Sequence, residues 1–228
     1  MKKNKIFRIA SVLLVATLLS TCAISGTFAK YVTSGSTSDD ARVAKFGVSI
    51  EGSSDMFKTE YAKSDSNYTG TLSVQSSSDD KLVAPGTSGS LVDFTIAGTP
   101  EVAVRVTYDV ETLTFENWAD ADSAYYCPIV ITVHTSAESD PDKTFSGLDY
   151  TSAEDFATAI IEAIEGSTYD YEPNTALSEQ GADNLGITWA WAFEGNDDEK
   201  DTALGDAAAE GTAATIEIEI TCTITQID

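Results

Sequence analysis

The chain has 228 residues, and its 37 Asp and Glu side chains outnumber its 13 Lys and Arg side chains, which gives a formal net charge of −24. Nucleic acids and anionic membrane surfaces are also negatively charged, so this composition excludes nucleic acid as a natural partner and disfavours binding to such membranes. Two copies repel each other over a Debye length of roughly 8 Å at physiological salt, and self-association has to overcome that repulsion.

The first 29 residues have the pattern of a signal peptide. Residues 9–19 are apolar, the small residues Thr27 and Ala29 precede Lys30, and a positively charged segment upstream contains Lys2, Lys3, Lys5 and Arg8. This order is typical of export signals, and the apolar run is shorter than the roughly 20 residues that span a bilayer. We expect cleavage between Ala29 and Lys30, which leaves a secreted chain with no membrane segment and with 13 − 4 = 9 basic side chains against 37 acidic ones.

The same region permits a second interpretation, that of a lipoprotein. Leu19-Ser20-Thr21-Cys22 is a loose lipobox in which Cys22 would be acylated. The apolar stretch continues past Cys22, which favours cleavage at Ala29 instead. A mature protein that begins at Lys30 by mass spectrometry would exclude the lipoprotein.

Residues 30–42 are rich in Ser, Thr and Gly, and Tyr31 and Val32 are their only sizeable apolar side chains. Such a segment buries too little apolar surface to order itself, so we expect it to be flexible in an isolated monomer. A folded domain is predicted from residue 43 to residue 228.

Period-two alternation of apolar and polar residues dominates this domain. In residues 101–113, for example, Val102, Val104, Val106, Tyr108 and Val110 share one face, which predicts a half-buried strand. Further strands are predicted at residues 43–51, 56–61, 69–75, 91–96, 125–135, 187–193 and 214–227.

One segment has the helical period. Phe156, Ile160 and Ile164 form a single stripe in residues 151–165, Thr151 and Glu154 form a capping box, and Gly166 is placed to end the helix. Many strands and one helix predict an all-β fold, a jelly-roll-like antiparallel β-sandwich with one inserted amphipathic helix.

Cys127 and Cys222 are the two cysteines that remain after cleavage, and each lies in a predicted strand. In an exported protein such a pair suggests a disulfide, which requires the two strands to be neighbours. Two buried free thiols are the equally weighted alternative.

Catalytic motifs are scarce. His134 is the only histidine, and neither a Gly-x-Ser-x-Gly elbow nor a His-Glu-x-x-His motif accompanies it. We therefore expect His134 to be a strand-end residue without a catalytic role, and we expect no enzymatic activity. Because carboxylates are abundant, glycoside hydrolysis by an Asp or Glu pair stays the weakest of the open alternatives.

Residues 194–202 form an acidic stretch with oxygen ligands of the kind that calcium prefers. The candidate ligands are Asn196, Asp197, Asp198 and Asp201. Their spacing is not that of an EF-hand, and an acidic solvated turn is the commoner explanation. No other cofactor is predicted.

Both ends of the chain resemble a known family. The junction Gly26-Thr27-Phe28-Ala29-Lys30-Tyr31, with Ala-Arg-Val-Ala-Lys-Phe-Gly-Val at residues 41–48, resembles the start of exported Gram-positive proteins with a SipW-dependent signal peptide, the family that contains the biofilm fibre protein TasA and camelysin. Residues 187–194, Ile-Thr-Trp-Ala-Trp-Ala-Phe-Glu, and the final Thr225-Gln226-Ile227-Asp228 are similar to a block that recurs in this family. Residues 112–186 have no counterpart.

The resemblance implies a jelly-roll domain that polymerises when the N-terminal segment of one subunit completes the sheet of the next, and it implies a SipW-type signal peptidase as the partner during export. Carried over to this chain, the donor segment lies within Lys30–Asp40 and is anchored by Tyr31 and Val32. The leading hypothesis is a secreted, self-associating structural protein of the extracellular matrix or cell surface. The rival is a monomeric surface module that binds glycans or proteins through Trp118, Tyr125 or Tyr126.

Overall fold

A computed structural model of the chain describes Leu14 and residues 41–52, 56–64, 67–92, 94–134, 142–177 and 185–228. The compact unit that carries the fold is Val43–Asp228. Its elements are β1 (Val48–Glu51), β2 (Glu60–Ala62), β3 (Leu72–Gln75), β4 (Ser88–Val92), β5 (Thr95–Gly98), β6 (Val104–Glu116), β7 (Ile129–His134), β8 (Lys143–Ser146), the 3-10 helix η1 (Gly147–Asp149), α2 (Ala153–Glu165), β9 (Tyr169–Tyr171), β10 (Gly186–Trp191), α3 (Asp198–Ala209) and β11 (Thr215–Gln226).

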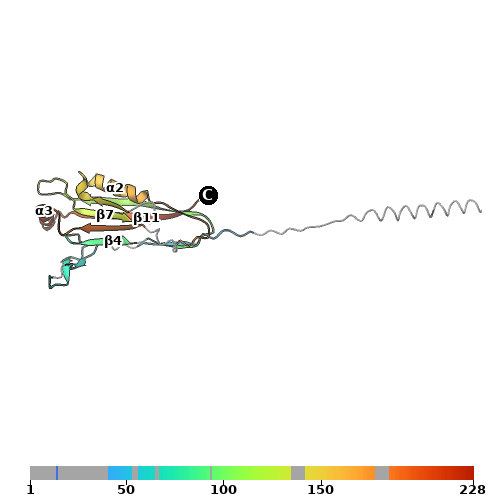
Figure 1. Ribbon diagram of the computed structural model, residues 1–228, viewed down its shortest axis with the longest axis horizontal. Helices are drawn as coiled ribbons and strands as arrows, with labels where there is room; N and C mark the ends of the chain where they lie inside the picture. The colour runs from blue at the N-terminus through green and yellow to red at the C-terminus, as the bar shows by residue number, and fades with distance from the viewer. Residues whose placement is uncertain are drawn as a thin grey trace, which may run out of the picture. The chain divides into compact units, whose positions relative to one another are not determined.

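Two antiparallel sheets make the body of this unit (Figure 1). One has the strand order β4-β10-β7-β8 and the other has the order β11-β6-β9, while β1-β5 and β2-β3 form two smaller pairs. The chain passes from one large sheet to the other between β6 and β7, between β8 and β9, and at both connections of β10. The predicted fold class, an all-β jelly-roll-like sandwich with an inserted helix, is confirmed.

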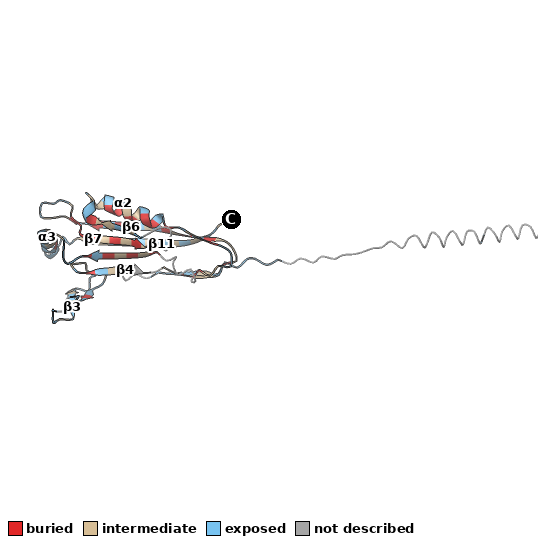
Figure 2. Ribbon diagram, viewed as in Figure 1, coloured by how far each residue is buried: buried red, intermediate tan, exposed pale blue. Residues whose placement is uncertain are grey.

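The interior lies between the two large sheets (Figure 2), and it is filled by alternate residues of their strands. In β10, Ile187, Trp189 and Trp191 are buried, as the alternating pattern predicts. The expected fourth member of this face, Phe193, is 69% exposed. Because β10 ends at Trp191, the alternation no longer applies to Phe193.

Strand β6 confirms its predicted face and adds a shift of register. Val104, Val106 and Tyr108 are buried, and beyond Val110 the pairing with β11 slips by one residue. A bulge of this kind moves every later side chain to the other face. Leu113 is therefore buried, and the apolar row continues to the end of the 13-residue strand.

Helix α2 confirms the one predicted helix. Phe156, Ile160 and Ile164 are buried, as expected. The cap lies one residue later than predicted, because the Ser152 side chain accepts a hydrogen bond from the Asp155 backbone N–H at 3.1 Å. The prediction of a single helix is wrong, since α3 follows β10.

Candidate functional site

The two flanks of the sandwich differ in how they are covered. Helix α2 packs on β6, β7 and β8 and closes one flank. There Phe156 lies against Phe115 with 4.7 Å between ring centroids, and the Val110 backbone N–H donates to the Glu165 carboxylate. The opposite flank, between β11 and the chain around β4, has a groove instead.

Two adjoining cavities of about 540 Å³ and about 490 Å³ form this groove, and they share Phe57, Lys81 and Ile216. Most of the other lining residues are apolar, and the large ones among them are Met56, Leu82, Val83, Phe94, Trp118, Trp191, Leu204, Ile218 and Ile220. Four acidic residues, Asp80, Asp201, Glu217 and Glu219, also line it. We call this feature the β11 groove. Its shape and apolar lining fit an extended chain better than a compact polar ligand.

One border of the groove is an edge of a sheet. Among the strands that the structure describes, β11 pairs only with β6. Alternate residues of this 12-residue strand direct their backbone N–H and C=O groups away from β6, toward that edge. Ile216, Ile218 and Ile220 are half-buried beside it. A long edge strand is a template for the addition of another strand, and proteins usually cover or interrupt it.

The facing wall depends on Gly89. A Cβ at this position would collide with the Met56 carbonyl oxygen, so glycine allows residues 56 and 57 to lie close to β4. The indole N–H of Trp189, which is 2% exposed, donates to that carbonyl at 2.9 Å. This contact fixes Met56 and Phe57 at the mouth of the sandwich.

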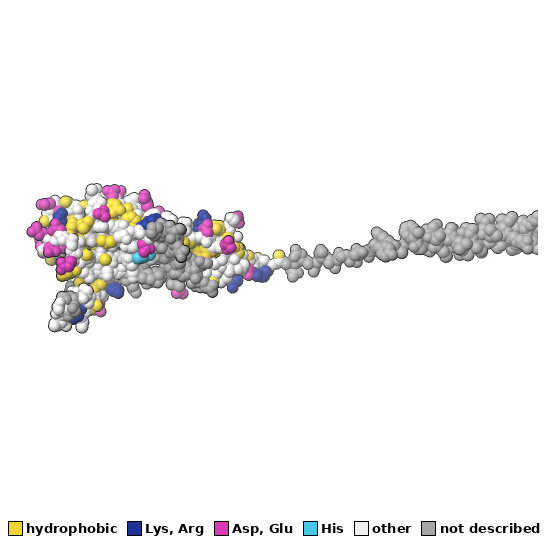
Figure 3. Space-filling model, in the orientation of Figure 1, with side chains coloured by type: hydrophobic (Ala, Val, Ile, Leu, Met, Phe, Trp, Pro, Cys, Tyr) yellow, Lys and Arg dark blue, Asp and Glu magenta, His cyan; other side chains and the backbone are white. Residues whose placement is uncertain are grey.

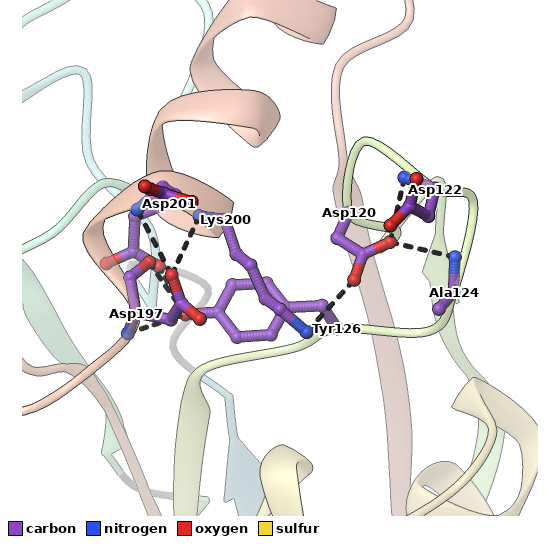
Figure 4. Close-up of polar contacts among 8 residues, drawn as sticks. Asp120, Asp122, Ala124, Tyr126, Asp197, Lys200 and Asp201 are labelled. Atoms are coloured by element: carbon purple, nitrogen blue, oxygen red, sulfur yellow. Dashed lines mark hydrogen bonds and ion pairs between the residues drawn. The ribbon is translucent and has the colours of Figure 1, made fainter.

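Helix α3 closes one end of the groove and is anchored by polar contacts (Figure 4). The Asp201 carboxylate accepts hydrogen bonds from the Tyr126 hydroxyl at 2.7 Å and from the Trp191 indole at 3.4 Å. Asp197 caps the helix by accepting from the N–H groups of Glu199 and Lys200. Burial, together with the bond to Asp201, raises the pKa of Tyr126.

We expect Asp201→Ala to lower the free energy of unfolding by about 1–3 kcal/mol, because the buried Tyr126 hydroxyl loses its close acceptor and keeps only the Asp197 carbonyl oxygen at 3.5 Å. Asp206→Ala, at an exposed position of the same helix, is the control and should change it by less than about 0.5 kcal/mol. Urea unfolding measures both variants. Equal effects of the two substitutions would mean that Asp201 does not anchor α3.

A second contact joins α3 to the loop after β6. The Lys200 ammonium lies 2.9 Å from Asp120 and 5.3 Å from the centre of the Tyr126 ring, and Figure 4 shows it between them. The hydrogen bond from Lys200 and the N–H of Ala124 hold the pKa of Asp120 below its ordinary value of 3.8.

This shift predicts a pH dependence. A carboxyl group whose pKa is lower in the folded protein stabilises the fold above its unfolded pKa, and it loses that contribution as the pH falls below 3.8 through the folded value. The difference in stability between the wild type and Lys200→Met should therefore shrink from neutral pH to about pH 2. Urea midpoints measure it, and a difference independent of pH would contradict the assignment.

The four candidate calcium ligands have separate contacts. Asp197 caps α3, Asp201 binds Tyr126 and Trp191, and the Asn196 side chain donates to the Ala192 carbonyl. Asp198 is an exposed residue of the first helical turn. No group of three or more His, Cys, Asp or Glu residues converges in the described part of the chain. These contacts do not favour calcium, which stays a prediction.

The two cysteines are free thiols. Cys127 precedes β7 in one large sheet, whereas Cys222 lies in β11 of the other, so the neighbouring strands that a disulfide needs are not formed. Of the two alternatives, the structure has the free thiols. Burial raises the pKa of Cys127 to about 12 and that of Cys222 to about 11.

Because the thiolate is the reactive form, both cysteines should react slowly with a thiol reagent in the folded protein at about pH 8. In the unfolded mature chain both should react, with or without prior reduction. A requirement for reductant would show a disulfide.

The aromatic residues considered for ligand binding do not form an exposed platform. Trp118 is 3% exposed and its indole N–H donates to the Thr215 carbonyl at 2.9 Å. Tyr126 is 5% exposed and Tyr125 is half-buried. Trp118 instead packs on Trp191 with the rings tilted by 57° and 5.6 Å between their centroids, and it lines the β11 groove.

His134 lies at the end of β7, as predicted. Its ring contacts the Asp142 carboxylate at 2.9 Å through Nδ1 and the Thr188 hydroxyl at 3.0 Å through Nε2. His134 and Asp142 are both substantially exposed, so this is a surface network.

Ala29, Lys30, Tyr31 and Val32, together with Cys22, lie outside the described residues. The predictions about cleavage and the donor segment therefore stay predictions. In the part of the chain with described positions, no helix is both long and apolar enough to cross a membrane.

The fold and the groove define a class: an antiparallel β-sandwich in which a helix closes one flank and the free edge of β11, as far as the strands are described, borders the other. No family model, no curated protein and no solved structure matches the chain.

Proposed function

We propose that the protein is a secreted structural protein whose copies assemble into fibres, the β11 groove of one copy receiving an extended segment of the next. The observation that carries this proposal is the 12-residue edge of β11 beside an apolar groove. Backbone hydrogen bonds to an added strand do not depend on its side chains. A polar segment can therefore supply the strand if a few apolar residues fill the groove.

The proposed occupant is the segment Lys30–Asp40, which becomes N-terminal after cleavage at Ala29. Its 11 residues reach at most roughly 36–40 Å when extended, which is close to the length of β11 at about 3.3 Å per residue. Tyr31 and Val32 supply the apolar contacts. Donation within one fibre is a head-to-tail contact, and such contacts extend without closing.

A peptide added in trans tests this assignment. A labelled peptide of residues 30–40 should bind to the chain that begins at Ala41, with saturation in fluorescence anisotropy. A peptide of the same composition in scrambled order, with the two apolar residues separated, is the control. Equal binding of both peptides, or of neither, would count against Lys30–Asp40 as the occupant.

The rival hypothesis, a monomeric surface-binding module, draws no support from the aromatic side chains, since Trp118 and Tyr126 are buried. The hydrolase has no observation in its favour.

A further inference from the structure

The outer faces of the two large sheets differ in charge. The sheet β11-β6-β9 carries exposed charged side chains, among them Arg105, Asp109, Glu116, Asp170, Glu217 and Glu219. The outward side chains of the other sheet, as far as its strands are described, are uncharged over eight positions: Ser88, Ser90, Val130, Thr132, Thr144, Ser146, Thr188 and Ala190. We call these eight residues the hydroxyl face. His134 and Asp142 lie at one end of it.

The register arranges the hydroxyl face in rows. Ser90, Thr188, Thr132 and Thr144 are direct partners across four strands, and the hydroxyls of Thr132 and Thr144 are 3.1 Å apart. Figure 3 shows the histidine on the visible side of the molecule, with Asp and Glu at the end that holds α3, along the upper edge, beside the histidine and at the opposite end of the body. An uncharged face this wide is unusual on a chain with 37 acidic side chains.

The surface shape of the hydroxyl face is compatible with docking against the same face of a second copy. A shallow depression of about 450 Å³ lies over β10, where Ala190 is small, and it is bordered by Ser90 of β4 and Val130 of β7. In a two-fold pair, Val130 of each copy can enter the depression of the other, because such contacts are reciprocal. Small and β-branched side chains also let two sheets approach to about 10 Å.

We propose that the hydroxyl face is the surface through which fibres of this protein associate side by side, with a second copy of the same face as its occupant. The absence of charge on the hydroxyl face favours a second copy as the occupant. Copies that repel each other can meet where no carboxylate has to be desolvated against another, and interface centres are generally depleted of charged residues.

The contact is weak in a single pair. Four strands about 4.8 Å apart and about five residues along each strand give an area on the order of 300 Å² per copy, below the roughly 800 Å² of a standard interface. Repetition along a fibre multiplies such contacts. The inference therefore rests on the proposed fibre function, and monomers should not pair through this face.

Substitution by a charge tests the proposal. Thr132→Glu places a carboxylate at the centre of the hydroxyl face, and Thr225→Glu, at an exposed position opposite Arg105 on the other sheet, is the control. Electron microscopy of the chain from Lys30 measures the fraction of fibre length in bundles. We expect that fraction to fall at least about tenfold for Thr132→Glu and to be unchanged for the control, with single fibres formed equally well.

Mixing separates a loss of contact from a folding defect. Fibres of Thr132→Lys added to fibres of Thr132→Glu should bundle again, because opposite charges then face each other. Bundles that persist in Thr132→Glu alone, or no rescue on mixing, would overturn the proposal while the fibre function stands. If Thr132→Glu instead loses retention on a neutral polysaccharide with bundling unchanged, the occupant is a glycan and the proposal is also overturned. Absence of fibres in every variant would be a failure of the proposed function itself.

Discussion

Ile218→Glu is expected to abolish fibre formation while the monomer stays folded. Ile218 is half-buried at the edge of β11 and lines the groove, so a strand docked there would bury an unpaired carboxylate. Such burial costs several kcal/mol or more, and each 1.4 kcal/mol changes an equilibrium constant tenfold. The critical concentration for assembly should therefore rise by roughly a hundredfold or more.

The matched control is Thr225→Glu, on the opposite face of the same strand and outside the groove. Sedimentation at increasing protein concentration gives the critical concentration, and thermal unfolding checks that both variants fold. Ala214→Trp, which fills the groove without a charge, should also block assembly. If Ile218→Glu assembles as readily as Thr225→Glu, the groove does not receive the strand.

Trp189→Ala should produce the largest loss of stability of any substitution considered. Trp189 is 2% exposed, contacts Phe57 and Tyr61 at ring distances of 5.3 Å and 6.2 Å, and donates to Met56. Truncation of a buried tryptophan lowers the free energy of unfolding by about 3–5 kcal/mol. For a domain of this size, that corresponds to a fall in Tm of roughly 6–20 °C.

Phe193→Ala is the control, because Phe193 continues the same sequence pattern but is 69% exposed. Its effect should lie within about 0.5 kcal/mol. Guanidinium unfolding measures both variants, and a change in midpoint without a change in slope would place the effect in the folded state. A large loss for Phe193→Ala would contradict its assignment to the surface.

The faces of single strands could be predicted from the sequence, because alternation is a local property. Val104, Val106 and Tyr108 in β6, and Ile187 and Trp189 in β10, are buried as their spacing indicates. The bulge beyond Val110 was not predictable, since it is a slip between β6 and a strand about 100 residues later.

Helix α3 was missed because it has little of an apolar stripe: Leu204 is its one buried residue, and Gly205 lies inside it. Its start was nevertheless encoded, since Asp197 is a good N-cap and Asp198, Glu199 and Asp201 give an acidic first turn. The same residues also suggested calcium, which stays a prediction, because carboxylates suit both the start of a helix and a cation site. Capping was the signal that could have identified the helix.

The β11 groove could not be predicted from one sequence. The half-polar, half-apolar pattern of β11 indicates one buried face, but it does not say whether a second strand lies beside it. Whether β11 has a free edge beside a groove depends on two tertiary features. One is the position of α2 on the opposite flank, and the other is the contact between Gly89 and Met56, two residues far apart in the sequence. Edges of sheets are a property of tertiary topology.

The most direct test of the central claim is negative-stain microscopy of two chains, one from Lys30 and one from Ala41, at low and high salt. Salt should promote assembly because it screens the repulsion between the strongly acidic copies. Strand donation predicts fibres from the longer chain and monomers from the shorter one. If both chains form fibres, or if both stay monomeric under every condition, the N-terminal segment does not drive assembly.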